Sequence, residues 1–246
     1  MIWLRSLAYN VVFYVNLVLF LVLGTPFYLT PRKWSIRALQ AWARTSLWWL
    51  EVICGTRYEV RGAENIPGGA VLVASKHQSA WDTFALLTLF DDPAMVLKRE
   101  LVFIPLFGWF IPKFRMIPVE RSSGAAALKI MVRRARDAAA MGRQIVIFPE
   151  GTRRLPGAPA DYKPGAAALY LQLGLPCLPV ALNSGLYWPR RKFLRYPGTI
   201  VVEILPAIEA GLKRRDFAQR LESAIETATA KLVGEGGREQ GPHAGG

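Results

Sequence analysis

Histidine and cysteine are both scarce in this sequence of 246 residues, which contains two of each. His243 lies in a glycine-rich tail, so His77 is the one histidine in the body of the chain. Because zinc hydrolases usually need several histidine ligands, a metal-dependent hydrolase is disfavoured, and we expect neither a metal nor a cofactor. Cys54 and Cys177 have apolar neighbours and no metal-ligand spacing, which predicts buried free thiols in a reducing, cytosol-facing domain.

Acidic residues are few compared with basic ones: the sequence has 18 Asp and Glu against 31 Lys and Arg, a formal net charge of +13. Such a charge predicts an anionic partner, either nucleic acid or a membrane surface. No nucleic-acid-binding motif accompanies the basic clusters, and 52% of the residues are apolar. The composition therefore favours an anionic membrane over nucleic acid.

Charged side chains are absent from Ser6 to Pro31, a run of 26 residues. About 20 apolar residues suffice to span the hydrocarbon core of a bilayer. A cleavable signal peptide is the alternative, but the stretch is long and aromatic and lacks a clear small-x-small cleavage site. Gly24-Thr25-Pro26 can break the segment into a helical hairpin that enters one leaflet only. The sequence thus predicts a membrane anchor and leaves open whether it spans the bilayer.

The flanks of this segment predict its orientation. Five of the eight tryptophans lie in the first 49 residues, as interfacial anchors do. Basic residues are more numerous after the segment than before it, which places the main domain on the cytoplasmic side of the inner membrane. The basic residue before it is Arg5, and those after it are Arg32, Lys33, Arg37 and Arg44.

Short apolar runs alternate with helical patterns along the rest of the chain, which predicts an α/β fold. We expect a mixed, partly parallel sheet flanked by helices, preceded by an N-terminal membrane-anchoring helical segment. The expected parts are anchoring helices at 1–54, a globular domain at 55–233 and a disordered glycine-rich tail at 234–246. The expected strands are 58–60, 71–74, 94–97, 116–119, 145–148, 178–182 and 199–205, and the clearest helix is 123–141, with Gly142 as its stop.

The string His77-Gln78-Ser79-Ala80-Trp81-Asp82 directly follows one of these apolar runs. A neighbouring carboxylate fixes the tautomer of a histidine and raises its basicity, so the pair indicates a general base. On one continuous helix the two side chains would diverge by about 140°. We therefore expect His77 in a strand-to-helix turn and Asp82 in the first helical turn. The alternative is structural, because Ser79-x-x-Asp82 is also typical of a helix capping pair.

Further polar residues follow other expected strands. Phe148-Pro149-Glu150-Gly151-Thr152-Arg153 predicts a tight turn after which Thr152 and Arg153 donate hydrogen bonds to an anion. Arg121 lies just past another strand, and Lys163 precedes an expected helix, whose N-terminus favours anions. Because open α/β sheets bind ligands at strand ends, these residues predict one site with a base and several cations.

In these motifs the chain resembles the glycerolipid acyltransferase family of PlsC and the eukaryotic lysophosphatidic acid acyltransferases. The resemblance covers roughly residues 55–210 and identifies 55–233 as an acyltransferase domain. The motifs are His77-x-x-x-x-Asp82, Arg121 after its strand, the string 148–153 and Pro176-Cys177-Leu178-Pro179-Val180, with Lys98-Arg99-Glu100-Leu101 similar to a K-x-E-L string.

The resemblance implies a role for each matching residue. It implies that His77 is the base and that Asp82 orients it. It implies a glycerol-phosphate site formed by Arg121, Glu150, Gly151, Thr152 and Arg153. Lys163 matches a lysine that follows the third motif in many members, and Lys98 and nearby backbone N–H groups are candidates for the oxyanion donor.

Three positions depart from the family pattern. Lys76 stands where Asn commonly precedes the histidine, and Arg154 stands where Ser usually follows the third motif. The second motif reads Ile117-Pro118-Val119-Glu120-Arg121 rather than a glycine-rich string ending in Asp-Arg. The departures leave the expected chemistry intact and concern the identity of the acceptor.

The resemblance implies transfer of an acyl group from acyl-carrier protein or acyl-coenzyme A to the 2-hydroxyl of 1-acylglycerol 3-phosphate, which gives phosphatidic acid. No Gly-x-Ser-x-Gly elbow is present, so a covalent acyl-enzyme is not expected. Two other functions stay open. One is a sibling acyltransferase for another lyso-lipid, such as lyso-ornithine lipid; the other is a non-catalytic basic module that docks on anionic membranes.

Overall fold

A seven-stranded sheet forms the centre of the computed structural model, which describes residues 1–120 and 124–240. The strand order is β1-β7-β6-β2-β5-β3-β4. The strands from β6 to β4 in this order are parallel, whereas β7 pairs antiparallel with β6 and parallel with β1. The predicted mixed α/β sheet is confirmed. Its strands are β1 (Thr56–Arg61), β2 (Val71–Ser75), β3 (Pro93–Lys98), β4 (Ile117–Val119), β5 (Gln144–Ile147), β6 (Cys177–Leu182) and β7 (Gly198–Ile204).

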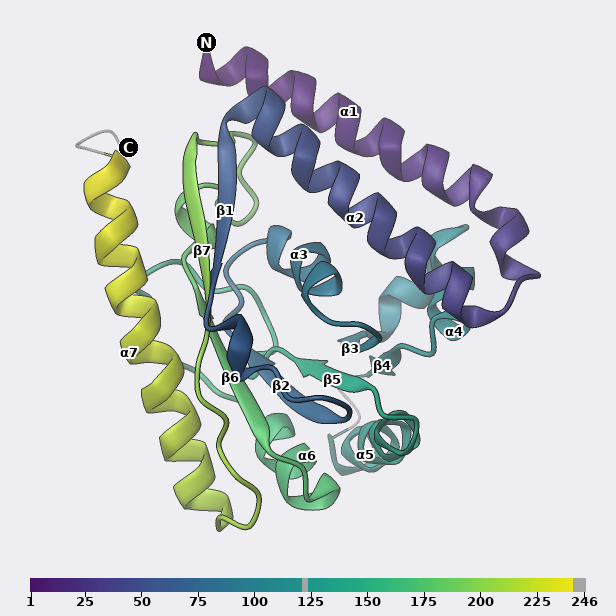
Figure 1. The fold of residues 1–246 in the computed structure, drawn as a ribbon, viewed down its shortest axis with the longest axis vertical. Coiled ribbons are helices and arrows are strands. Elements are labelled where there is room, and N and C mark those ends of the chain that lie inside the picture. Colours follow the sequence, from purple (N-terminus) through teal and green to yellow (C-terminus); the bar gives the residue numbers. More distant parts are fainter. Residues whose placement is uncertain (121–123, 241–246) are drawn as a thin grey trace.

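Helices cover both faces of this sheet (Figure 1). One face packs against α2 (Arg32–Cys54), α3 (Trp81–Leu89) and α4 (Phe107–Lys113), with α1 (Ile2–Leu23) lying along the outer side of α2. The other face packs against α5 (Gly124–Ala140), α6 (Gly165–Leu173) and α7 (Arg214–Gln240). Short 3-10 helices connect them: η1 (Thr25–Tyr28), η2 (Ala63–Asn65), η3 (Arg99–Phe103) and η5 (Ser184–Leu186).

Strand β2 shows how the sequence produces these layers. Side chains alternate between the two faces of a strand, so a parallel strand buried on both faces is apolar throughout. Val71 and Val73 belong to the core under α2 and α3, and Leu72 and Ala74 to the core under α5 and α6. All five residues of β2 are buried. This central position carries His77, which follows β2, into the middle of the sheet edge.

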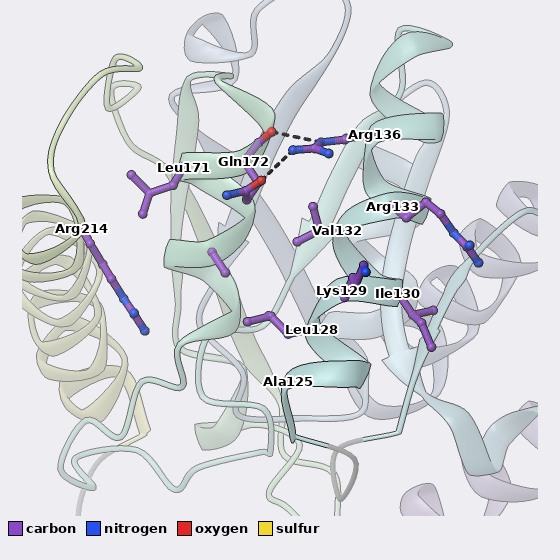
Figure 2. A pocket seen from close by; sticks show the side chains of 11 residues that line it. Ala125, Leu128, Lys129, Ile130, Val132, Arg133, Arg136, Leu171, Gln172 and Arg214 are labelled. Atoms are coloured by element: carbon purple, nitrogen blue, oxygen red, sulfur yellow. Dashed lines mark hydrogen bonds between the residues drawn. The ribbon is translucent and has the colours of Figure 1, made fainter.

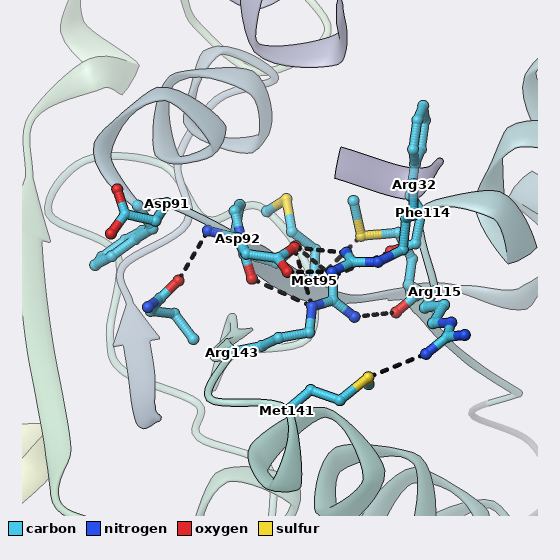
Figure 3. Close-up of polar contacts among 12 residues, drawn as sticks. Arg32, Asp91, Asp92, Met95, Phe114, Arg115, Met141 and Arg143 are labelled. Carbon is cyan, nitrogen blue, oxygen red and sulfur yellow. Dashed lines mark hydrogen bonds and ion pairs between the residues drawn. The ribbon is translucent and has the colours of Figure 1, made fainter. Parts of the chain in front are cut away.

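Arg143, at the start of β5, is a fully buried cation that joins several elements (Figure 3). Its guanidinium donates hydrogen bonds to the carbonyl oxygens of Phe114 and Arg115, at 3.0 and 2.9 Å. It also pairs with Asp92 over 3.1 Å, and Asp92 in turn binds Arg32 at the start of α2. The cluster ties α2 to the sheet.

The C-terminal helix corrects one expectation. The tail was predicted to be disordered from Gly234, but α7 continues to Gln240, and 241–246 lie outside the described residues. Glu235 pairs with Arg61 of β1 over 2.9 Å. A Cβ on Gly236 would lie only 2.8 Å from a side-chain carbon of Leu186, so the absent side chain permits the close contact. Packing against the sheet overrides the low helix propensity of glycine.

Helix α1 is long and apolar enough to cross a membrane by length and composition. Most of its apolar side chains are exposed, among them Val11, Val15, Val18 and Leu19. Tyr9, in contrast, is fully buried, and its hydroxyl donates a hydrogen bond to the Ser46 carbonyl of α2 at 3.4 Å. The predicted N-terminal apolar helix is present, and it indicates membrane association while one side of it packs on the domain.

Candidate active site

Three of the predicted site segments begin where parallel strands end. His77 follows β2, the turn 148–151 follows β5, and Lys98 is the last residue of β3. Since these strands are parallel, their carboxyl ends lie at one edge of the sheet, where open α/β sheets bind ligands. Ser184, which follows the neighbouring strand β6, reaches the same edge.

His77 and Asp82 are in direct contact. His77 Nδ1 lies 2.9 Å from a carboxylate oxygen of Asp82, which is in the first turn of α3. The predicted arrangement, with the histidine in the strand-to-helix turn and the aspartate in the first helical turn, is confirmed. Donation of the Nδ1 proton to Asp82 leaves a lone pair on Nε2, as a general base requires.

The carboxylate of Asp82 is fully buried and held by further donors. The backbone N–H groups of Gln78 and Ser79 donate to it at 2.8 and 2.9 Å, and the Ser184 hydroxyl donates to its other oxygen. Asp82 therefore contacts His77 and at the same time accepts the Ser79 N–H, which is the bond that a capping pair predicts. The capping interpretation and the catalytic one are compatible, because one carboxylate accepts from all these donors.

The turn 148–151 fixes the His77 ring from the other side. The Phe148 ring stacks on the imidazole with a centroid distance of 3.9 Å. Glu150 accepts a hydrogen bond from the His77 backbone N–H at 3.2 Å. The Gly151 N–H closes the turn onto the Phe148 carbonyl at 2.9 Å, as the Pro-Glu-Gly sequence predicts. The histidine is thus held between two elements that follow adjacent strands.

Glu150 lies behind the histidine in a buried ionic network that sequence reasoning missed. The Lys76 ammonium binds Glu150 at 2.8 Å and Glu226 of α7 at 2.7 Å, and Tyr162 donates to Glu226 at 2.9 Å. Burial raises the pKa of the Glu150 carboxyl above its ordinary value, although the Lys76 hydrogen bond opposes the shift. The Lys76 departure from the family pattern was the available signal, since a buried lysine needs carboxylate partners.

A cavity of about 480 Å³ opens beside His77. Its polar end contains His77, Gly151, Thr152 and Arg153, and Lys98 also lines it. Burial lowers the pKa of Arg153, while the negative charge of Asp82 opposes that shift. Most of the remaining wall is apolar and comes mainly from α2, α3, β3 and α4, with Leu39, Trp42, Phe84, Leu87, Ile111 and Phe114 among its residues. A base and cations therefore stand at the end of an apolar space.

The remaining predicted site residues lie in other settings. Glu150 is buried against Lys76 and is not among the residues that line the cavity. Lys163 is exposed and pairs with Asp161 over 2.7 Å, also outside the cavity lining. Lys98 pairs with Glu100 over 2.8 Å at the cavity wall. Arg121 falls outside the described residues.

A second cavity, of about 660 Å³, lies between α5 and α6 (Figure 2). Arg136 of α5 crosses it and donates a hydrogen bond to the Gln172 carbonyl at 3.3 Å. Among the residues that the structure describes, its lining contains none of the predicted site residues and no histidine or carboxylate. Although this cavity is larger, its described lining has no histidine–carboxylate pair, so the chemistry belongs to the cavity beside His77.

The fold and the site define an α/β enzyme with a histidine–aspartate pair beside an apolar cavity. The chain belongs to the acyltransferase family, whose sequence pattern matches residues 57–183. A 1-acyl-sn-glycerol-3-phosphate acyltransferase of Pseudomonas aeruginosa is 44% identical over 198 residues, which cover 79% of this chain and 77% of that protein. The family predicted from the motifs is confirmed.

More distant relatives carry the same name. A 1-acyl-sn-glycerol-3-phosphate acyltransferase of Limnanthes alba is 32% identical over 63% of this chain, which spans 55% of the plant protein. The crystal structure of the PlsC acyltransferase from Thermotoga maritima superimposes with a TM-score of 0.80 and 22% identity. The superposition covers 94% of this chain and 98% of the T. maritima chain, so the two proteins share nearly the whole fold.

Proposed function

We propose that this protein transfers an acyl group from a thioester to the 2-hydroxyl of 1-acylglycerol 3-phosphate, with His77 as the general base. The product is phosphatidic acid, a precursor in phospholipid biosynthesis. The 44% identity to the P. aeruginosa 1-acyl-sn-glycerol-3-phosphate acyltransferase supports this reaction. The observation that carries the mechanism is the buried His77–Asp82 contact of 2.9 Å at the polar end of an apolar cavity.

The reaction needs a base because an alcohol is a weak nucleophile. His77 Nε2 takes the hydroxyl proton as the oxygen attacks the thioester carbonyl, and Asp82 stabilises the resulting imidazolium. The tetrahedral intermediate collapses by breaking the carbon–sulfur bond, and the imidazolium returns the proton to the thiolate. Lys98 and nearby backbone N–H groups are the candidates for stabilising the oxyanion.

The cavity lining divides substrate binding between its two ends. The apolar wall holds an acyl chain, and Thr152 and Arg153 bind the glycerol phosphate through hydrogen bonds and charge. Gly151 keeps the turn open beside them, and Glu150 supports the turn from behind. Arg121 and Lys163 are proposed for the phosphate from the family motifs alone.

The partners and location follow from the same chemistry. The acyl donor is acyl-carrier protein or acyl-coenzyme A, and the acceptor is a lysophospholipid delivered from an anionic membrane. Residues 1–54 anchor the acyltransferase domain of 55–233, on the cytoplasmic side of the inner membrane. The exposed apolar side of α1 and the net charge of +13 support this placement.

The test is product analysis by mass spectrometry with purified protein, several lyso-lipids and both donors. We expect phosphatidic acid from lysophosphatidic acid, and a loss of about 10²–10⁴ in kcat/KM for His77→Ala. The loss of kcat/KM for Asp82→Asn should be in the same range, because the variant places an amide next to backbone N–H donors that face a carboxylate in the wild type. Unfolding midpoints of the variants serve as the control for folding.

Three outcomes would contradict the proposal. Wild-type activity confined to another lyso-lipid, such as lyso-ornithine lipid, would make the protein a sibling acyltransferase. Near-wild-type turnover of His77→Ala would show that His77 is not the general base. Binding to anionic vesicles without any transferase activity would show that the protein is a non-catalytic docking module.

A further inference from the structure

Two arginines outside the family motifs line the cavity beside His77. Arg190 and Arg191 belong to the segment between η5 and β7, and both are among the cavity-lining residues together with Arg153. Arg190 is half-buried and Arg191 is exposed. The segment follows β6, so it reaches the same sheet edge as His77. Three arginines therefore line one cavity, and the charges of Arg190 and Arg191 act on Arg153.

Among residues 1–120 and 124–240, no ion pair joins a carboxylate to Arg153, Arg190 or Arg191. Burial lowers the pKa of Arg153, and the charges of Arg190 and Arg191 lower it further while Asp82 opposes them. Like charges in a half-buried space repel one another, and a bound anion offsets this repulsion.

Another arginine, Arg195, stabilises the conformation of the segment that carries Arg190 and Arg191. Buried Arg195 donates hydrogen bonds to the Lys192, Phe193 and Leu194 carbonyls at 2.8–2.9 Å, and its guanidinium lies 4.1 Å over the Trp188 ring. Arg191 itself adopts a left-handed conformation, with φ 58°. A non-glycine residue in this region is uncommon and is held there by its surroundings. The arginines are therefore presented by an ordered segment.

We infer that Arg190 and Arg191, with Arg153, form the binding site for the doubly charged phosphate monoester of the acceptor. The inference rests on the proposed function and adds the determinant of headgroup selectivity. Three cations favour a dianion over the single charge of a phosphodiester and over a zwitterionic headgroup, because each unit of ligand charge interacts with all three. His77 lines the same cavity, so a phosphate bound to the three arginines places the glycerol backbone near the base.

The experiment measures steady-state kinetics in mixed micelles for Arg190→Gln, Arg191→Gln and the double variant. We expect KM for lysophosphatidic acid to rise about 10-fold or more for each single variant and further for the double, with kcat and the donor KM nearly unchanged. Arg190→Lys and Arg191→Lys should recover part of the loss, because they keep the charge. Lys192→Gln is the matched control, since Lys192 is exposed and does not line the cavity.

A second acceptor separates headgroup binding from other effects. Transfer to 1-acylglycerol, which lacks phosphate, should be equally slow in wild type and variants. An unchanged KM for lysophosphatidic acid overturns the inference, and so does a rise confined to the donor KM, which would assign the arginines to the donor's phosphates. Either result leaves the proposed function standing if wild type still acylates lysophosphatidic acid and His77→Ala does not.

Discussion

Lys76 is a buried ammonium group directly before His77, and it replaces the amide residue common at this family position. It lies between the carboxylates of Glu150 and Glu226, at 2.8 and 2.7 Å. Glu150 also accepts a hydrogen bond from the His77 backbone N–H, so the Lys76–Glu150 ion pair is connected directly to the histidine. Lys76 is thus a positioning residue whose ion pair holds the turn 148–151 against the histidine.

Lys76→Met should destabilise the protein by about 3–5 kcal/mol, because it leaves the Glu150 carboxylate buried without a cation. Lys76→Met combined with Glu150→Gln should be more stable than the sum of the two single effects, since position 150 then buries no charge, and Glu226 is partly exposed and keeps the Tyr162 donor. Denaturant unfolding in detergent measures the double-mutant cycle. Exposed Lys231→Met is the control, and additivity of the two changes would show that the residues are not coupled.

At the scale of elements, the start of α2 is attached to the sheet by charge. Arg32 opens α2 and binds Asp92, which precedes β3 and also contacts buried Arg143 (Figure 3). Burial opposes ionisation of Asp92, but the hydrogen bond from Arg32 and the charge of Arg143 outweigh it, so the pKa of Asp92 is below its ordinary value. One carboxylate therefore attaches to the sheet the start of a helix that lines the cavity.

Asp92→Asn should cost about 3 kcal/mol of unfolding free energy at pH 7, because Arg143 stays buried with less compensation. The lowered folded-state pKa stabilises the fold above the unfolded-state pKa, and this contribution is lost as pH falls through the folded-state pKa. The difference between wild type and Asp92→Asn should therefore shrink on acidification below about pH 4. Unfolding curves at several pH values test this, with exposed Asp91→Asn as control; a pH-independent difference would contradict it.

At the scale of the whole molecule, α1 has two different sides. Its inner side binds the arginine-bearing segment: the Ser6 hydroxyl accepts from the Arg195 backbone N–H at 2.9 Å, and the Asn10 side chain accepts from the Arg195 guanidinium at 3.2 Å. Its outer side exposes Val11, Val15 and Leu19. One side of the helix is therefore part of the core, and the other is an exposed apolar surface that indicates membrane association.

The triple variant Val11→Ser, Val15→Ser, Leu19→Ser should bind anionic vesicles more weakly. Its free energy of unfolding and its acyltransferase activity in mixed micelles should stay near those of the wild type. Burying one Val or Leu contributes about 1.5–3 kcal/mol, so the three changes should lower partitioning by about 10³-fold or more. Vesicle sedimentation measures this. Tyr9→Ala is the matched inner-side variant and should instead destabilise the fold, because Tyr9 is fully buried. Unaltered vesicle binding of the triple variant would assign the anchor to other residues.

The sequence by itself determined the features that depend on neighbours along the chain. Short apolar runs between helical patterns located all seven strands, because both patterns depend only on residues close together in the chain. The five-residue spacing of His77 and Asp82 was also sufficient, since a strand-to-helix turn brings such positions together without help from elsewhere. The α5 stop was local as well, with Gly142 at φ 71° just past its end.

Only the tertiary structure decided the features that join distant segments. Ser184 reaches Asp82 across 102 positions and Lys76 reaches Glu226 across 150, and no local pattern encodes such pairings. The helical course of 234–240 came from packing on the sheet, which composition does not report. In the sequence, Arg190 and Arg191 belong to one of several basic clusters, and nothing in the local pattern relates them to His77. Their position beside His77 arises because β6 and β2 are adjacent parallel strands, so the segments that follow them meet at one edge.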